Sequence, residues 1–226
     1  MTVGVSDFFR VGRRADPLRV DVRYQGAGRF DDPERLVPML YGSSSLRTCL
    51  LEFMLPWAPA FEASAILGNI PQPTSDDEAI DADRDRRIAA EPRRVPPSLY
   101  ERVAVHIRAE PALALIDLRE VAVRERLANV EAIAQEMRAR GFAQLDRGAL
   151  LSPHRPLTQA ITGAVVRGTL FPRVDGLFVE SRHAGDVVVV FAGEPFAPRL
   201  DIVAGEPLTP SSREVITTAS ELGLVP

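Results

Sequence analysis

A short stretch in the first quarter of the chain places its apolar residues at helical spacing. These apolar residues are Leu46, Cys49, Leu50, Phe53 and Met54. Their i, i+3, i+4, i+7, i+8 pattern, with the serines 43–45 as N-cap residues before it, predicts a helix of about three turns that ends at Pro56. Glu52 projects roughly 130° from the centre of the apolar stripe. We therefore expect its carboxylate to face water or a cleft.

Elsewhere, short apolar runs alternate with longer amphipathic stretches. Between residues 8 and 42 the runs are bounded by glycine and proline, which favours short strands and turns. Further strands are predicted at 113–118, 174–179 and 186–191, the last two as a hairpin. Further helices are predicted at 123–137, at 157–166, and from the Ser211–Glu214 capping box to Gly223.

The order of these elements shows no regular strand–helix–strand repeat, and we find no internal sequence repeat. We therefore predict the α+β class, with one compact domain over residues 1–226. The segment at about 70–97 is rich in Asp, Arg, Glu and Pro. It is interpreted as a charged surface insertion, mobile or partly helical.

Composition excludes several classes of protein. With 46% hydrophobic and 26% charged residues, the chain has the balance of a soluble globular protein. No apolar run approaches the ~18 to 20 residues that a membrane-spanning helix needs. The net charge of −4 argues against a nucleic-acid partner. Residues 1–14 have no apolar stretch followed by a cleavage site, so we expect a cytoplasmic location.

The usual metal and nucleotide motifs are absent. Cys49 is the only cysteine and the three histidines lie far apart in sequence, so we predict no metal site. Neither a P-loop nor a Gly-x-Gly-x-x-Gly fingerprint occurs. All 27 basic residues are arginine, which we attribute first to genomic composition.

Several short motifs nevertheless occur in a particular order. They are Phe8-Phe9-Arg10, Gly28-Arg29-Phe30, Leu40-Tyr41-Gly42-Ser43, Leu51-Glu52-Phe53, Leu157-Thr158-Gln159-Ala160-Ile161 and the run from Asp175 to Ser181-Arg182. Glu52 follows Tyr41 by 11 positions. This order resembles the RES domain family, named for its Arg, Glu and Ser. The resemblance covers a core of residues 7–194 and leaves 196–226 as a C-terminal helical extension.

The resemblance implies an enzyme that degrades NAD, often the toxin of a bacterial toxin–antitoxin pair. It also implies a split, mixed or antiparallel sheet similar to that of diphtheria-toxin-type ADP-ribosyltransferases. By position, Arg10 and Arg29 resemble the arginines that hold the dinucleotide, and Tyr41 the aromatic residue beside the nicotinamide. Glu52 resembles the essential carboxylate, and Ser181 the polar contact from a late loop. Arg29, Tyr41 and Glu52 are the expected catalytic residues.

Elementary chemistry agrees with these roles. Arginine forks suit the oxygens of a diphosphate, and Tyr41 can stack on the nicotinamide and lend its hydroxyl. Cleavage of the nicotinamide–ribose bond builds positive charge on the ribose, which a carboxylate such as Glu52 stabilises without a metal. Inorganic phosphate is a further co-substrate if phosphorolysis is the reaction. Arg182 and Arg47 are then the candidates by position to hold it.

Alternatives stay open at this point. Water or phosphate is the acceptor in a glycohydrolase or phosphorylase, whereas a protein is the acceptor in an ADP-ribosyltransferase. A non-catalytic NAD-binding or interaction module is the third hypothesis. Asp31 stands where the family has asparagine, and so adds a negative charge beside a site for a polyanion. An antitoxin and a homodimer are partners that the resemblance alone suggests.

Overall fold

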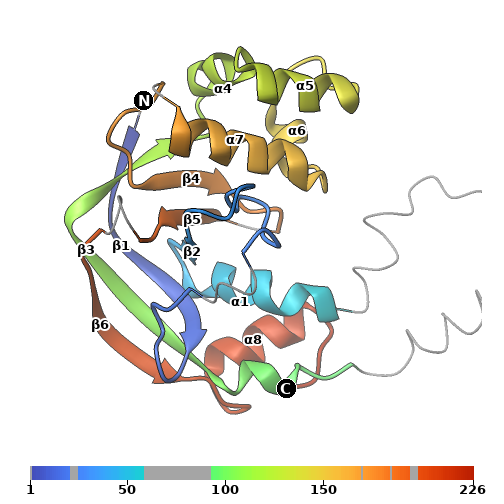
Figure 1. Cartoon of the computed structure of the whole chain (residues 1–226). Helices are drawn as coiled ribbons and strands as arrows, with labels where there is room; N and C mark the ends of the chain where they lie inside the picture. The colour runs from blue at the N-terminus through green and yellow to red at the C-terminus, as the bar shows by residue number, and fades with distance from the viewer. Residues whose placement is uncertain (1, 21–24, 59–92, 169, 184, 194–197) are drawn as a thin grey trace, which may run out of the picture.

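The computed structural model describes residues 2–20, 25–58, 93–168, 170–183, 185–193 and 198–226 (Figure 1). In the first half of the chain its elements are β1 (Thr2–Arg13), β2 (Met39–Ser43), α1 (Leu46–Met54), the 3-10 turns η2 (Leu55–Trp57) and η3 (Pro97–Leu99), and β3 (Arg102–Asp117). In the second half they are α4 (Val121–Ala128), α5 (Glu131–Ala139), α6 (Arg147–Leu151), α7 (Arg155–Arg167), β4 (Gly176–Glu180), β5 (Asp186–Phe191), β6 (Leu200–Pro207) and α8 (Arg213–Glu221).

The described strands form one mixed sheet in the order β1-β2-β5-β4-β3-β6, and β1 also pairs with β3. The β3–β4 pairing is parallel, and the other pairings are antiparallel. A single residue pair, Phe9 with Ser43, joins β1 to β2. Because β1 contacts both β2 and β3, the sheet curls back on itself. The predicted α+β class with a mixed sheet is confirmed.

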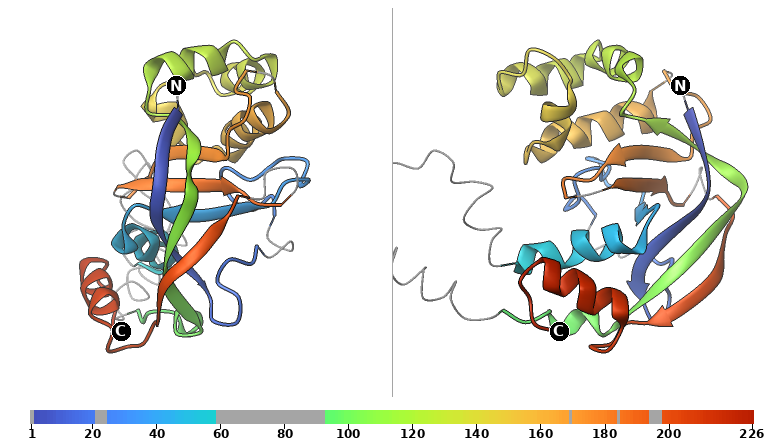
Figure 2. Two further views of the ribbon diagram at one scale, coloured as in Figure 1. Left: turned by 90° about the vertical axis from the view of Figure 1, so that its left-hand side faces the viewer. Right: turned by 180° about the vertical axis from the view of Figure 1, so that it is seen from behind.

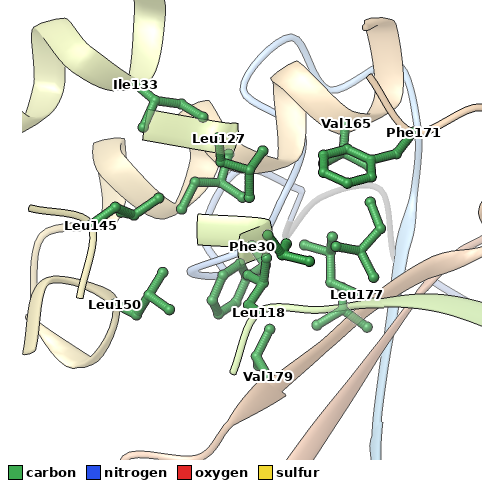
Figure 3. Close-up of a cluster of buried hydrophobic side chains, with 14 of the residues drawn as sticks. Phe30, Leu118, Leu127, Ile133, Leu145, Leu150, Val165, Phe171, Leu177 and Val179 are labelled. Carbon is green, nitrogen blue, oxygen red and sulfur yellow. The ribbon is translucent and has the colours of Figure 1, made fainter. Parts of the chain in front are cut away.

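Helices cover the sheet on two sides. In Figure 1, α4, α5, α6 and α7 lie above β4 and β5, whereas α1 and α8 lie below β2 and β5. Figure 3 shows part of the upper core, where Leu127 of α4, Ile133 of α5 and Val165 of α7 gather above Leu177 and Val179 of β4. Hydrophobic burial thus fixes the α4–α7 layer on the sheet.

A second hydrophobic cluster lines the inside of the curled sheet. It includes Phe8, Leu40, Ile107, Leu115 and Val188, each no more than 1% exposed. A third cluster lies under α1 and α8, which run side by side in both views of Figure 2. The position of α1 is therefore set by the sheet on one side and α8 on the other.

Four predicted elements are confirmed. Helix α1 begins after Ser45, whose side chain accepts a hydrogen bond from the Thr48 amide, and Pro56 lies in the η2 turn that follows it. Helix α7 extends the predicted 157–166 by a few residues, and β4 and β5 form the predicted antiparallel pair. The sequence was sufficient in these places because the helices each bury one apolar face, whereas β4 and β5 are short apolar runs buried at consecutive positions.

Other elements differ from the prediction. The helix expected over 123–137 is broken into α4 and α5 at Asn129, whose side-chain amide donates to the Glu125 carbonyl at 2.9 Å. Such side-chain bonds compete with helical backbone bonds. The strand expected at 113–118 is the end of the much longer β3. Helix α8 begins after Ser212, so the prediction that Ser211 caps this helix is wrong.

The helical extension predicted for 196–226 is wrong in its first half, because β6 lies there. Seven of its eight residues are exposed, so its sequence carries no alternation of buried and exposed positions. Only its hydrogen bonds to β3 define it as a strand. Sequence periodicity detects burial and therefore has no means of finding such an edge strand.

Most of the charged segment 70–97 lies outside the described residues. Its end, however, is not a surface insertion. Val95 is 2% exposed, and its amide donates to the Val225 carbonyl at 2.8 Å. Among the described residues, no helix has the length and apolar character needed to cross a membrane.

Candidate active site

Four of the five residues predicted for NAD binding and catalysis line one cavity of about 340 Å³, here called the central pocket. Its lining residues are Arg10, Val11, Gly28, Arg29, Phe30, Tyr41, Gly42, Ser43, Cys49, Glu52, Phe53, Val179 and Val187. They come from β1, the loop before β2, β2 itself, α1, β4 and β5. The pocket is largely apolar, with one carboxylate and two guanidinium groups in its wall.

The carboxylate of Glu52 is held by Ser181, the fifth predicted residue. Helix α1 buries Leu50, Leu51 and Met54, and Glu52 is exposed on another face, as its position relative to the stripe predicts. The Ser181 hydroxyl donates to Glu52 Oε1 at 2.6 Å. Ser181 is 5% exposed, and its Oγ accepts the His183 amide at 3.0 Å. One carboxylate oxygen is therefore fixed by a residue 129 positions away.

Arg29 and Arg182 bring positive charge to the same region. Arg29 Nη2 donates to the Leu150 carbonyl, and Arg182 Nη2 to the Ser152 carbonyl. Burial lowers the pKa of Arg29 to about 10, and repulsion by Arg182 acts in the same direction, whereas Glu52 opposes it. Both side chains remain charged at neutral pH. The buried Nε atom of each has no hydrogen-bond partner among the described residues.

The loop that carries Arg29 is fastened by Tyr41 and Asp31. The Tyr41 hydroxyl donates to Asp31 Oδ1 at 2.7 Å and accepts the Phe30 amide at 3.1 Å. Asp31 Oδ2 accepts the Gly28 amide at 2.7 Å. A Cβ at Gly28 would lie 2.6 Å from both the Asp31 carboxylate and the Tyr41 hydroxyl, so only glycine fits there.

These contacts engage two residues singled out in the sequence. The Tyr41 hydroxyl is hydrogen-bonded within the loop, and Tyr41 lines the central pocket. Burial and the Asp31 charge raise the pKa of Tyr41 well above its ordinary value. Asp31 is 5% exposed, and both of its oxygens accept hydrogen bonds within the loop.

Helix α7 holds the same loop from the other side. Gln159 Nε2 donates to the carbonyls of Gly26 and Gly28, each at 3.0 Å. Thr158 donates to the Arg29 carbonyl, and Thr162 to the Phe30 carbonyl. The sequence offered a signal for this role. When two threonines spaced i, i+4 on a helix are both buried, their hydroxyls need hydrogen-bond acceptors.

Arg10 also contacts backbone oxygens. Its Nε donates to the Pro17 carbonyl and its Nη1 to the Tyr41 carbonyl, each at 2.8 Å. Burial lowers its pKa to about 10. Arg10 thus ties the loop after β1 to β2 while lining the central pocket.

Two further cavities adjoin the central pocket. The arginine pocket, of about 570 Å³, is lined by Arg10, Arg13, Arg19, Val20, Gln25, Ala27, Gly28, Asp31, Met39, Tyr41, Glu52, Phe53 and Arg102. The helix-side pocket, of about 440 Å³, is lined by Arg29, Phe30, Leu118, Arg119, Arg124, Arg147, Leu150, Leu151, Val179, Glu180, Gly185 and Asp186. Each shares lining residues with the central pocket.

The structure argues against Arg47 as a phosphate ligand and against a reactive thiol at Cys49. Arg47, considered for phosphate, pairs with Glu221 at 2.6 Å and lines none of these three pockets. Burial raises the pKa of Cys49 to about 12, so its thiol stays protonated. In the described part of the chain, no three His, Cys, Asp or Glu residues cluster as metal ligands would.

A sequence profile of the RES domain family matches residues 7–211. This chain is a RES domain protein. The match runs past the expected core of 7–194 and includes β6, so this strand belongs to the domain. No protein of curated function matches the chain.

The RES domain also resembles a solved structure. A chain of the crystal structure of the M. tuberculosis MbcT–MbcA toxin–antitoxin complex superimposes with a TM-score of 0.55 at 18% sequence identity. The alignment covers 98% of this chain and 91% of the other. At this identity the likeness establishes a shared fold.

Proposed function

We propose that this RES domain protein degrades NAD by cleaving the bond between nicotinamide and ribose. The observation that carries the proposal is the meeting of Glu52, Arg10 and Arg29 in one largely apolar pocket, with Ser181 bonded to the Glu52 carboxylate. Membership of the RES family supports the same substrate, because the resemblance of the chain to that family implies NAD degradation.

The chemistry follows from where the charges lie. As nicotinamide leaves, positive charge develops on the ribose, and a carboxylate beside it lowers the barrier. Ser181 donates to Oε1 of Glu52, which leaves Oε2 available for the ribose. The apolar wall excludes water around the ring, which strengthens this electrostatic interaction.

For the acceptor, we propose water or inorganic phosphate. Arg182 is the remaining candidate to hold phosphate, because its charge interacts with Glu52 and its Nε has no partner among the described residues. The similar solved structure is that of a toxin–antitoxin complex, which supports a protein antitoxin as a partner of this chain. A homodimer and a cytoplasmic location stay predictions.

The test is NAD consumption by the purified protein with and without phosphate, with products separated by mass. We expect Glu52→Gln to lower kcat about 10²- to 10³-fold, as loss of a preorganised electrostatic contact does. It should remain folded, because Glu52 is exposed on α1. Glu125→Gln, which removes an exposed carboxylate on α4, is the matched control and should leave the rate unchanged.

The products decide between acceptors. Free ADP-ribose identifies water, a phosphorylated ADP-ribose identifies phosphate, and transfer of label from NAD to a protein identifies an ADP-ribosyltransferase. Glu52→Gln with a rate within threefold of the wild type would reject the role of Glu52. Unchanged NAD under every condition would reject the proposed activity.

A further inference from the structure

The connection between β4 and β5 contacts α1 at two points. At one end, the Ser181 hydroxyl donates to Glu52 Oε1 at 2.6 Å. At the other end, a Cβ added to Gly185 would lie 2.6 Å from Thr48 Oγ1, so Thr48 comes close to the Gly185 backbone. Thr48 and Glu52 are four residues apart on α1, and residues at this spacing lie on the same face of a helix. Both ends of the connection therefore meet one face of α1.

Backbone hydrogen bonds tie these two ends to each other. Glu180 and Asp186 are the last residue pair of the ladder between β4 and β5. Just beyond this pair, the Ser181 amide donates to the Gly185 carbonyl at 3.0 Å. A shift of Gly185 away from α1 would therefore carry Ser181 with it or break this bond. The place of the Ser181 hydroxyl thus depends on how closely Gly185 approaches α1.

Thr48 has little freedom to move away from Gly185. It is 2% exposed, and its β-branched side chain is restricted to few rotamers in a helix. Its Oγ1 lies 2.9 Å from the Ser45 hydroxyl oxygen, which also accepts the Thr48 amide at 3.1 Å. A side chain at position 185 would therefore collide with a group that is itself held in place.

The backbone at Gly185 is fixed as well. Its φ of 73° lies in the left-handed region, which favours glycine. The next residue, Asp186, is held by Ser43, whose hydroxyl donates to the Asp186 carbonyl at 2.6 Å and accepts the Ser45 amide at 3.2 Å. The start of β5 is thus joined to the segment that begins α1.

We infer that Gly185 is a positioning residue for Glu52. Because Gly185 has no Cβ, the connection between β4 and β5 can lie against Thr48, and this contact sets the Ser181 hydroxyl on the Glu52 carboxylate. The inference rests on the proposed function, because it takes Glu52 as the group that stabilises positive charge on the ribose. Gly185 acts through Ser181, one hydrogen bond away from that carboxylate.

The first measurement needs no NAD turnover. A double-mutant cycle of Ser181→Ala and Glu52→Ala in urea unfolding measures the coupling between these two side chains. We expect a favourable coupling in the wild-type background. In the Gly185→Ala background we expect its loss, because the added Cβ moves Ser181 away from Glu52.

Gly141→Ala is the matched control background. Gly141 has a φ of 71°, and no described atom beyond its chain neighbours lies within 4 Å of the place where its Cβ would stand. The substitution imposes the same backbone strain without a collision, so the coupling should persist. Adding Thr48→Ala to Gly185→Ala removes the colliding oxygen and should restore the coupling. This double variant also serves if Gly185→Ala alone does not fold.

The second measurement is NAD turnover. Gly185→Ala should lower kcat about tenfold, the effect of losing one hydrogen bond to a charged group, with KM within threefold of the wild type. In the Thr48→Ala background the same change should lower kcat less than threefold. In the Ser181→Ala background it should change kcat less than twofold, because the hydrogen bond is already absent. A residue that only stabilised the fold would not show this dependence on Ser181.

The outcomes separate this inference from the proposed activity. The inference is refuted if the coupling is absent from the wild type, persists in Gly185→Ala, disappears in Gly141→Ala, or fails to return with Thr48→Ala. Loss of coupling in Gly185→Ala alone, without any NAD turnover by the wild type, supports the positioning role and rejects the activity. NAD turnover that Gly185→Ala leaves unchanged supports the activity and rejects the positioning role.

Discussion

The Tyr41 hydroxyl offers a direct test of how the Arg29 loop is held. Tyr41→Phe keeps the aromatic ring in the central pocket and deletes only the hydroxyl. That hydroxyl donates to Asp31 at 2.7 Å and accepts the Phe30 amide at 3.1 Å. The change therefore removes two hydrogen bonds and leaves a carboxylate oxygen and an amide without their partner.

The magnitude follows from the burial of the groups left behind. A hydrogen bond to a charged group contributes about 1.5 to 3 kcal/mol, and an orphaned amide costs about 1 kcal/mol more. Asp31 is 5% exposed, so little water reaches it in compensation. We expect Tyr41→Phe to lower the free energy of unfolding by about 2 to 4 kcal/mol.

The assay is urea unfolding at pH 7, with Tyr100→Phe as the matched control. The Tyr100 hydroxyl is buried and makes no hydrogen bond within the described ranges, so its loss should change stability by less than about 0.5 kcal/mol. The reasoning fails if Tyr41→Phe costs less than about 1 kcal/mol or if the two variants lose the same stability.

Two further predictions concern ionisation. Burial alone would raise the pKa of Asp32, but Arg167 and three backbone amides outweigh it, so the folded pKa lies below the ordinary value. This stabilisation is present above about pH 4 and is lost as the pH falls through the folded pKa. We expect Arg167→Met to cost about 2 kcal/mol at pH 7 and much less near pH 2 in urea unfolding, and an equal cost at both would contradict the assignment. Because burial raises the pKa of Cys49 to about 12, a thiol reagent at pH 8 should label the native protein far more slowly than the unfolded protein, and equal rates would contradict its burial.

The sequence was informative where function depends on local geometry. The position of Glu52 off the apolar stripe followed from helix periodicity, because α1 buries one face and exposes another. Motif order was enough to bring Arg10, Arg29, Tyr41 and Glu52 together, and their common pocket agrees with it.

The sequence could not supply contacts between distant segments. Gln159 and Thr158 hold a loop some 130 residues earlier in the chain. The sequence around them gives no indication of which segment they contact. The hydrogen bond from the Tyr41 hydroxyl to Asp31 could not be predicted for the same reason, because it depends on how the loop folds back over β2. Strand β6 was not predicted, because its exposed residues show no alternation of apolar and polar positions that follows burial.

The hydrogen bond between Ser181 and Glu52 also has a consequence for synthesis. The two residues are 129 positions apart, and β4, which leads to Ser181, pairs with β3 and β5. A ribosome that has translated only as far as residue 150 carries a chain that lacks Ser181. That chain already contains Arg10, Arg29, Tyr41 and Glu52. The carboxylate then has no donor to orient it and no β4 to close the pocket. Newly made chains therefore stay without an assembled site until Ser181 has been translated.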